Sequence, residues 1–281
     1  MNWLDLWIMS HVNSLVNRWW ILDAAIVQTS YLTLLTGAVL MAMFWWSWME
    51  HGKETAEQHV TLMLTLFATV PAVFVARALA YSLPYRERPI HDPRLHFHIA
   101  YTQDPTWLIH WSSFPSDHAA VSFCVAMGLC MVSRRLGTWA IAYAALISLP
   151  RVYLGFHYPT DILGGALVGM GVAYLTKIAS LRSITRWALT HLHPHSAFLY
   201  TFLFVFTFEI GEMFSSFQRI LFLGITALRR LPRGALVGVS IPLLLVVLLG
   251  VLAGLIWWRH RPLQEEGSSA FSATLGRDHV R

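Results

Sequence analysis

Charged residues are scarce in this chain of 281 residues. Aspartate, glutamate, lysine and arginine together make up 12% of the sequence, whereas hydrophobic residues make up 56%. A soluble domain carries about 25% charged residues. The shortage of charge therefore excludes an ordinary soluble domain and favours a protein embedded in a lipid bilayer.

Three further features are absent or rare. No cleavable signal peptide is evident, because the first positive charge is Arg18 and no basic region precedes an apolar core. Two cysteines, Cys124 and Cys130, lie six residues apart in one apolar run, so we expect buried, inert thiols and no disulfide. The formal net charge is only +5 and the basic residues are scattered among loops, so nucleic acid is not an expected partner.

Apolar runs long enough to cross a bilayer recur along the chain. A transmembrane helix needs about 20 apolar residues, and only helices and closed barrels satisfy their backbone in lipid. The sequence therefore predicts an all-α, polytopic bundle of six or seven spans. The expected spans are Thr29–Trp48, Val60–Leu83, Asp117–Val132, Gly137–Leu154, Thr160–Ser180, Ser196–Phe214 and Ala235–Trp258.

The flanks of these runs predict an orientation. Residues Trp3–Trp20 are expected to form a helix in the membrane interface, with tryptophans at the headgroup level. Basic residues that follow the first, third and fifth spans mark the cytoplasmic face, and these are Lys53, Arg134, Arg135, Lys177, Arg182 and Arg186. The segments around Tyr85–Pro115 and Phe156–Thr160 then lie on the external face.

The segment Pro150–Asp161 lies between two apolar runs and carries Arg151, His157 and Asp161. Charged groups in such a place are costly and usually functional. A histidine ring nitrogen can attack phosphorus, and an aspartate on the other nitrogen fixes the tautomer. A guanidinium can hold phosphate oxygens through two parallel hydrogen bonds. The pattern predicts a phosphoryl-transfer site at a membrane surface.

A second segment, Ser113–Ala119, precedes the next apolar run. Ser116 is a good N-cap for the helix that follows. The free amides of its first turn, including those of Asp117 and His118, would form an anion site. His118 would be placed to protonate a leaving oxygen. Taken alone, the segment is equally compatible with an ordinary capped helix that carries a surface histidine.

A third group of residues supplies guanidiniums, namely Arg77, Arg86 and Arg88. Several guanidiniums are what a phosphate site needs if no metal neutralises the charge. The alternative is a basic cluster that touches lipid headgroups; for Arg86 both interpretations stay open, whereas Arg88 favours the site. His91, His96 and His98 lie in a polar loop, and we predict no metal and no cofactor.

These three segments resemble the three signature motifs of the type-two phosphatidic acid phosphatase and vanadium haloperoxidase superfamily. Those motifs run lysine, six residues, arginine-proline; then proline-serine-glycine-histidine; then serine-arginine, five residues, histidine, three residues, aspartate. The matching positions are Arg88 with Pro89, then Pro115, Ser116 and His118, then Arg151, His157 and Asp161. The phenylalanine-proline-serine-aspartate-histidine form of the second motif is most similar to that of bacterial undecaprenyl-pyrophosphate phosphatases.

The resemblance implies a role for each matching residue. His157 would be the nucleophile that becomes phosphorylated, His118 the general acid, and Asp161 the residue that orients His157. The phosphate ligands would be Arg88, Arg151 and Ser116.

Three departures from the motifs stand out. The lysine is missing; Arg77 is the nearest basic candidate, although ten residues rather than six separate it from Arg88, and Arg86 is the other candidate. Asp117 replaces the glycine. Its amide could still bind phosphate, but its carboxylate would need an arginine partner or a different direction. Pro150 stands where serine is usual.

We therefore expect a phosphatase-like membrane domain at residues 1–195, with a catalytic core at about 60–180, further spans at 196–261 and a disordered tail at 262–281. The expected activity is hydrolysis of a lipid phosphate or diphosphate, with undecaprenyl diphosphate preferred, on the external side of the inner membrane. The alternative substrates are phosphatidate and phosphatidylglycerol phosphate. The alternative class is a non-catalytic membrane protein that binds or transports lipid. The sequence does not indicate an oligomeric state.

Overall fold

The computed structural model describes residues 3–213, apart from 33, 51–54, 105, 107 and 193–195. Within these residues the structure contains helices and no strands, which confirms the all-α prediction. The predicted span Ala235–Trp258, the predicted tail 262–281 and the basic residue Lys53 lie outside the described residues.

The helices run in chain order from one end of the described part to the other. They are α1 (Trp3–Asn13), α2 (Trp20–Tyr31), α3 (Val39–Met49), α4 (Thr55–Ser82), α5 (Asp117–Val132), α6 (Arg134–Tyr153), α7 (Pro159–Tyr174), α8 (Ala179–Leu192) and α9 (Ser196–Gly211). A π-helical turn covers Leu34–Ala38, and short 3-10 turns cover Pro89–His91, Pro93–Leu95 and Leu175–Lys177.

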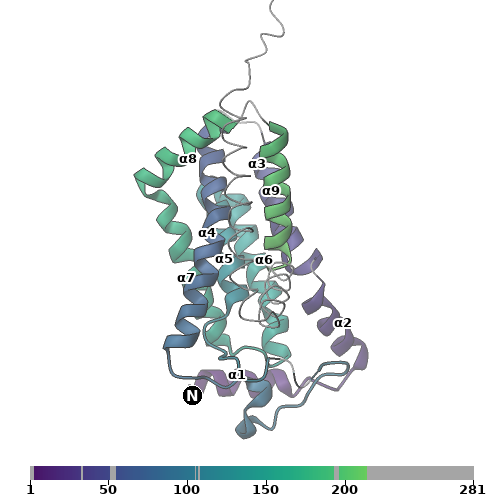
Figure 1. Ribbon diagram of the computed structural model, residues 1–281. Coiled ribbons are helices and arrows are strands. Elements are labelled where there is room, and N and C mark those ends of the chain that lie inside the picture. The colour runs from purple at the N-terminus through teal and green to yellow at the C-terminus, as the bar shows by residue number, and fades with distance from the viewer. Residues whose placement is uncertain are drawn as a thin grey trace, which may run out of the picture. The chain divides into compact units, whose positions relative to one another are not determined.

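Helix α5 is the centre of the bundle. Helices α4, α6 and α7 pack around it, and α3 and α9 lie together along one side (Figure 1). Most of the α5 side chains are buried, as expected for a helix that is apolar all round. The core around α5 includes Phe44, Leu62, Val125, Leu129 and Leu203.

Small residues let α7 approach α5 closely. A Cβ atom at Gly165 would clash with the carbonyl oxygen of Ser116, and one at Gly169 would clash with the carbonyl of Ala120. Close backbone approach at small residues is typical of helix pairs in membranes. This contact fixes the start of α7, with Asp161, beside the start of α5.

Two predicted helices are broken in the structure. The interfacial helix expected over Trp3–Trp20 ends at Asn13, because the chain turns through Asn17 in the left-handed region (φ 65°) before α2 begins. The span expected over Thr29–Trp48 is also wrong as one helix, since α2 and α3 are separated by the π-helical turn. Gly37 lies in that turn, where the backbone of α9 leaves no room for a Cβ atom.

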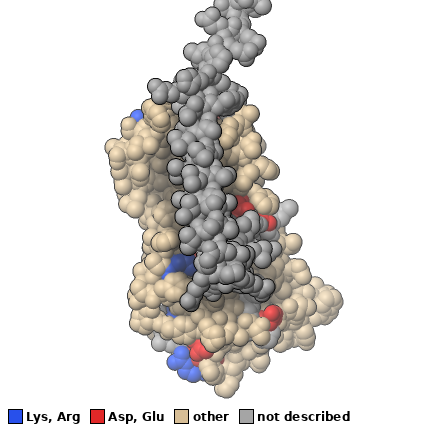
Figure 2. Space-filling view, viewed as in Figure 1, with Lys and Arg blue, Asp and Glu red and all other residues tan. Residues whose placement is uncertain are grey.

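The predicted number of spans is not confirmed. Among the described residues one helix, α4, is long and apolar enough to cross a membrane, and the number rises to three if the bent pairs α2–α3 and α7–α8 each count as one span. The expected Thr160–Ser180 span ends at Tyr174, and the chain bends by 71° into α8. Figure 2 shows that charged side chains form only small patches on the described part of the visible face.

Helix α1 lies across the end of the bundle where α5 and α7 begin (Figure 1). Asp5, Met9 and Asn13 recur at four-residue spacing and are buried, while Trp3 and Trp7 are exposed. The basic residues used to predict orientation, from Arg134 to Arg186, follow the other ends of α5 and α7. The two ends of the bundle therefore differ in chemistry.

The α5–α7 contact predicts an asymmetric response to alanine. Gly169→Ala should destabilise the protein by about 1–3 kcal/mol, the usual cost of overpacking. Gly171 in the same helix has open space around its Cα, so Gly171→Ala should be neutral or stabilise by up to about 1 kcal/mol through helix propensity. Thermal unfolding midpoints in one detergent compare the two variants. Equal midpoints would show that the contact is looser than described.

Candidate active site

Three segments of chain meet at the end of the bundle where α1 lies. They are the loop after α4, the start of α5 with the residues before it, and the turn between α6 and α7. Backbone hydrogen bonds join each pair of segments. They run from Ser113 N to the Arg86 carbonyl (2.9 Å), from Ser116 N to the Asp161 carbonyl (3.0 Å), and from Ile90 N to the Gly155 carbonyl (3.0 Å). The three sequence motifs thus form one structural unit.

Arg88 lies at the centre of this unit and is only 6% exposed. Its guanidinium donates to three backbone carbonyls, those of Trp111 (3.1 Å), Ser112 (3.2 Å) and Phe156 (2.6 Å). Burial lowers the pKa of this guanidinium, but an arginine stays charged at neutral pH. The side chain therefore places a fixed positive charge between the first and third motifs.

His157 lies between two groups that determine its tautomer. Its Nδ1 atom is 2.8 Å from the Ser113 carbonyl oxygen, and its Nε2 atom is 3.3 Å from Nη1 of Arg88. A carbonyl only accepts and a guanidinium only donates, so the proton is on Nδ1 and the lone pair is on Nε2. Burial lowers the pKa of His157 from its ordinary value of 6.5, Arg88 lowers it further, and Asp161 opposes both effects. The ring is therefore neutral at pH 7.

Asp161 occupies the first turn of α7, with Pro159 at the first helical position as predicted. Its Oδ2 atom accepts a hydrogen bond from Tyr158 N (2.7 Å) and lies 3.7 Å from Nδ1 of His157. The aspartate and the histidine are therefore neighbours, as the sequence predicts. The hydrogen bond that fixes the ring, however, is made by the Ser113 carbonyl.

Arg86 joins Asp161 to the N-terminal helix. Its Nη1 donates to Asp161 Oδ1 (2.6 Å) and its Nη2 to Asp5 Oδ2 (2.6 Å), while its guanidinium lies 4.2 Å from the centre of the Tyr158 ring. Asp5 also accepts from the backbone amide (3.1 Å) and the hydroxyl (2.6 Å) of Thr160. Both carboxylates are fully buried. The structure thus gives Arg86 two carboxylate partners, which neither sequence interpretation anticipated.

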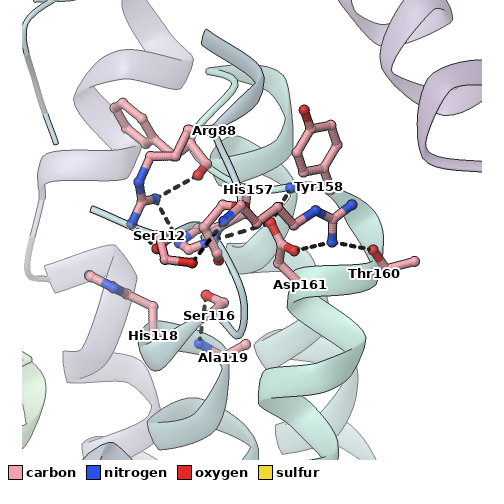
Figure 3. Close-up of polar contacts among 12 residues, drawn as sticks. Arg88, Ser112, Ser116, His118, Ala119, His157, Tyr158, Thr160 and Asp161 are labelled. Atoms are coloured by element: carbon pink, nitrogen blue, oxygen red, sulfur yellow. Dashed lines mark hydrogen bonds and ion pairs between the residues drawn. The ribbon is translucent and has the colours of Figure 1, made fainter. Parts of the chain in front are cut away.

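The start of α5 brings the second motif to the same place. Ser116 caps the helix as predicted, because its hydroxyl accepts from Ala119 N (3.4 Å). Figure 3 shows the side chains of His118, Ser116 and His157 together at this helix start. A cavity beside them is lined by Thr36, Ser116, His118, Ser122, Ile147, Ser148, Arg151, Ile162 and Met213. It is polar on the side of the serines, His118 and Arg151, so it suits a phosphate group.

Arg151 reaches this cavity from the last turn of α6. Its Nη2 atom donates to the Ser30 carbonyl (3.3 Å). Ser148, one helical turn earlier, also lines the cavity, and its hydroxyl donates to the Ala144 carbonyl (2.7 Å). A hydroxyl oxygen therefore remains near Arg151 although Pro150 replaces the motif serine.

Two of the departures from the family motifs pair with each other. Helix α4 ends at Ser82 and the chain loops out at Pro84, which keeps Arg77 near the bundle end. Its Nη2 atom lies 2.6 Å from Oδ2 of Asp117. The other oxygen, Oδ1, accepts from the backbone amide (2.9 Å) and Nδ1 (3.0 Å) of His118. The arginine partner that the Asp117 carboxylate requires is therefore Arg77.

A larger open depression lies on the other side of Asp161. Its volume is about 580 Å³, and its lining includes Asp5, Arg86, Arg94 and Tyr158 but neither His118 nor His157. No group of three or more His, Cys, Asp or Glu side chains in the described ranges is arranged to hold a metal ion. The carboxylate of Asp92 instead accepts from Arg94 (2.8 Å) and Tyr158 (3.1 Å). The cysteines are free, with Cys124 buried and Cys130 only partly so.

Sequence reasoning missed two contributors to the site. Ser113 acts through its backbone carbonyl, which leaves no signal in the side-chain pattern. Asp5 did carry a signal, because it is an isolated carboxylate within an apolar stretch, and such groups seek a partner. Its partner lies about eighty positions away in sequence, at Arg86.

Comparison with known proteins agrees with this geometry. The family model described as PAP2 superfamily matches residues 61–184. The putative undecaprenyl-diphosphatase YbjG of Escherichia coli is 30% identical over 152 residues, which cover 54% of this chain and 69% of that protein. The undecaprenyl-diphosphatase BcrC of Bacillus subtilis is 24% identical over 169 residues, which cover 59% of this chain and 76% of that protein.

A shorter match reaches a protein of different printed activity. The lipid A 4'-phosphatase of Bacteroides thetaiotaomicron is 45% identical over 58 residues, which cover 20% of this chain and 26% of that protein. No solved structure matches the chain. The family match and the similarity to YbjG show that the chain belongs to the PAP2 superfamily, and it is a phosphatase of that group.

The position of Arg86 predicts a stability defect. Arg86→Met would leave two buried carboxylates without their counter-ion and should cost about 3–5 kcal/mol of unfolding free energy. Adding Asp5→Asn removes one of the two uncompensated charges and should recover part of the loss. Arg135→Met, at an exposed position of α6, is the control and should change stability little. Thermal midpoints in detergent measure all three; an unaltered midpoint for Arg86→Met would contradict the bridging role.

Proposed function

We propose that this protein hydrolyses a lipid diphosphate through a phosphohistidine intermediate. The observation that carries the proposal is the tautomer of His157, whose unprotonated Nε2 lies beside the guanidinium of Arg88. A neutral imidazole with a free lone pair next to a fixed cation is suited to attack an anionic phosphorus centre.

The first step would form the intermediate. Nε2 of His157 attacks the terminal phosphorus, and the bond between phosphorus and the bridging oxygen breaks. His118 donates a proton to that oxygen, so the lipid leaves as a monophosphate. Negative charge that grows on the transferring group is stabilised by Arg88 and Arg151, with Ser116 and the first amides of α5 as further donors.

The second step would regenerate the enzyme. Water attacks the phosphorus, the bond between nitrogen and phosphorus breaks, and His118 now accepts the proton from the water. Inorganic phosphate leaves, and Nε2 recovers its lone pair. The guanidiniums supply the positive charge in both steps, so the proposed reaction requires no metal ion.

Undecaprenyl diphosphate is the proposed substrate, because YbjG and BcrC are named as undecaprenyl-diphosphatases. The similarity to a lipid A 4'-phosphatase keeps other lipid phosphates in view, including phosphatidate and phosphatidylglycerol phosphate. A panel of lipid phosphates offered to the purified protein, with release of inorganic phosphate as the readout, would rank them. Phosphate release from none of them would favour the non-catalytic alternative.

We further propose that the active site faces the outside of the inner membrane and that residues 1–195 carry the catalytic machinery. The basic residues Arg134, Arg135, Lys177, Arg182 and Arg186 support this orientation, because they lie at the end of the bundle opposite the site. Residues 196–261 would add C-terminal spans, of which α9 packs into the core through Leu199 and Leu203.

The catalytic roles predict different responses to two substitutions. His157→Ala should abolish turnover, because no other group accepts the phosphoryl group. His118→Ala should slow a lipid diphosphate about 100-fold or more but p-nitrophenyl phosphate far less, since acid catalysis matters most for basic leaving groups. Activity of His157→Ala within tenfold of the parent would refute the nucleophile. Loss of parent activity with EDTA, restored by a divalent ion, would refute the metal-free mechanism.

The orientation is tested by labelling in cells. In a parent with Cys124 and Cys130 replaced by alanine, Thr102→Cys in the loop at the site end should react with an impermeant thiol reagent once the outer envelope is permeabilised. Arg135→Cys, at the opposite end, should react only after the inner membrane is broken. The reverse pattern would place the site in the cytoplasm.

A further inference from the structure

The aspartate in the second motif makes contacts that the proposed mechanism has not used. Oδ1 of Asp117 lies 3.0 Å from Nδ1 of His118, and the same oxygen accepts from the His118 backbone amide at 2.9 Å. Two contacts from one carboxylate oxygen hold both the backbone and the ring of the histidine. The side chain of Asp117 therefore faces His118 and Arg77.

This contact determines which nitrogen of His118 is available. A carboxylate only accepts, so Nδ1 carries a proton and donates it to Asp117. Nε2 is then the nitrogen left to serve the cavity, which His118 lines together with Ser122, Ser148 and Arg151. A carboxylate on one ring nitrogen orients a histidine and stabilises its protonated form. The protonated form is the one that can give a proton to a leaving oxygen.

The surroundings of His118 explain why such a partner matters. The charged and titratable groups that act on the ring are Asp117, Arg151 and His157, and burial acts in addition. Arg151 disfavours a second positive charge, and so does His157 when it is protonated. Asp117 is the group in this set that favours it. Without the carboxylate, His118 would hold its proton less well.

Arg77 occupies the other side of the same carboxylate. Its Nη2 atom is 2.6 Å from Oδ2 of Asp117, and its guanidinium lies 4.8 Å from the centre of the Trp111 ring. A bare carboxylate beside a phosphate site would repel the substrate. The ion pair with Arg77 reduces that repulsion and holds the carboxylate toward His118.

We propose that Asp117 is a positioning residue that orients His118 and favours its protonated form, and that Arg77 acts through Asp117 rather than on the substrate. The proposal rests on the proposed function, in which His118 is the general acid. It assigns a different role to both residues from the one that the family motifs suggest, since the motif lysine and glycine lie where phosphate binds.

The first experiment compares leaving groups and pH. Asp117→Asn keeps the shape but loses the charge. It should lower kcat for a lipid diphosphate by about 10- to 100-fold, within the range of general acid catalysis, while p-nitrophenyl phosphate loses less than about threefold because its leaving group needs little protonation. The alkaline limb of the kcat profile should move to lower pH. Asp104→Asn, in the same outer loop region, is the matched control and should leave rate and profile unchanged.

A second background separates positioning from folding. In His118→Ala, which has no ring to orient, the additional change Asp117→Asn should have no further effect on kcat. Thermal midpoints show whether each variant is folded. Equal losses for both leaving groups, with an unmoved alkaline limb, would overturn the role of Asp117.

The third experiment is a double-mutant cycle between Arg77 and Asp117. Arg77→Met should reduce kcat in the parent but have little effect in the Asp117→Asn background, because its partner charge is already gone. Inhibition by vanadate, an analogue of phosphate, should change little in Arg77→Met. Additive losses together with much weaker vanadate inhibition would show that Arg77 binds phosphate directly.

These outcomes are separable from failure of the proposed function. A His157→Ala protein that retains activity, or a His118→Ala protein that slows both leaving groups equally, would refute the mechanism itself. If both of those variants behave as expected while Asp117→Asn matches the Asp104→Asn control, the mechanism stands and the inference about Asp117 is wrong.

Discussion

The buried guanidinium of Arg88 is the interaction on which the rest of the site depends. A charge taken out of water is costly unless its hydrogen bonds are satisfied, and here three backbone carbonyls from two separate loops accept from it. Those loops can form only if they close around the arginine together. The same closure places the Ser113 carbonyl and Arg88 on opposite sides of His157, so the binding of one cation also determines the protonation pattern of a second residue.

Carboxylates at this end of the bundle are matched to arginines in a consistent way. Arg86 holds Asp161 and Asp5, whereas Arg77 holds Asp117. Each of the two histidines then has a carboxylate close to Nδ1, at 3.7 Å for His157 and 3.0 Å for His118. Positive charge around a phosphate thus coexists with negative charge behind each ring. A site of this kind can bind an anion and still move a proton.

The sequence predicted the chemistry of the site better than its wiring. The spacing of Arg151, His157 and Asp161 indicated their proximity, since Pro159 starts a helix and puts the aspartate in its first turn. Ser116 could be recognised as a cap by its residue type. The pairing of Arg77 with Asp117 and of Arg86 with Asp5 could not be predicted, because it depends on tertiary packing. The break between α2 and α3 was missed for a similar reason: hydropathy does not register a neighbouring helix that approaches at Gly37.

The hydrogen bond from His157 to the Ser113 carbonyl also limits the identity of any covalent adduct. A carbonyl oxygen cannot take up the Nδ1 proton, so that nitrogen keeps its hydrogen throughout and has no lone pair to offer. A phosphoryl group carried by this ring would therefore be bonded at Nε2, and the adduct would be a single positional isomer. The two isomers of phosphohistidine differ in chemical shift and in hydrolytic lifetime, so a trapped protein would report the direction of the ring without a crystal.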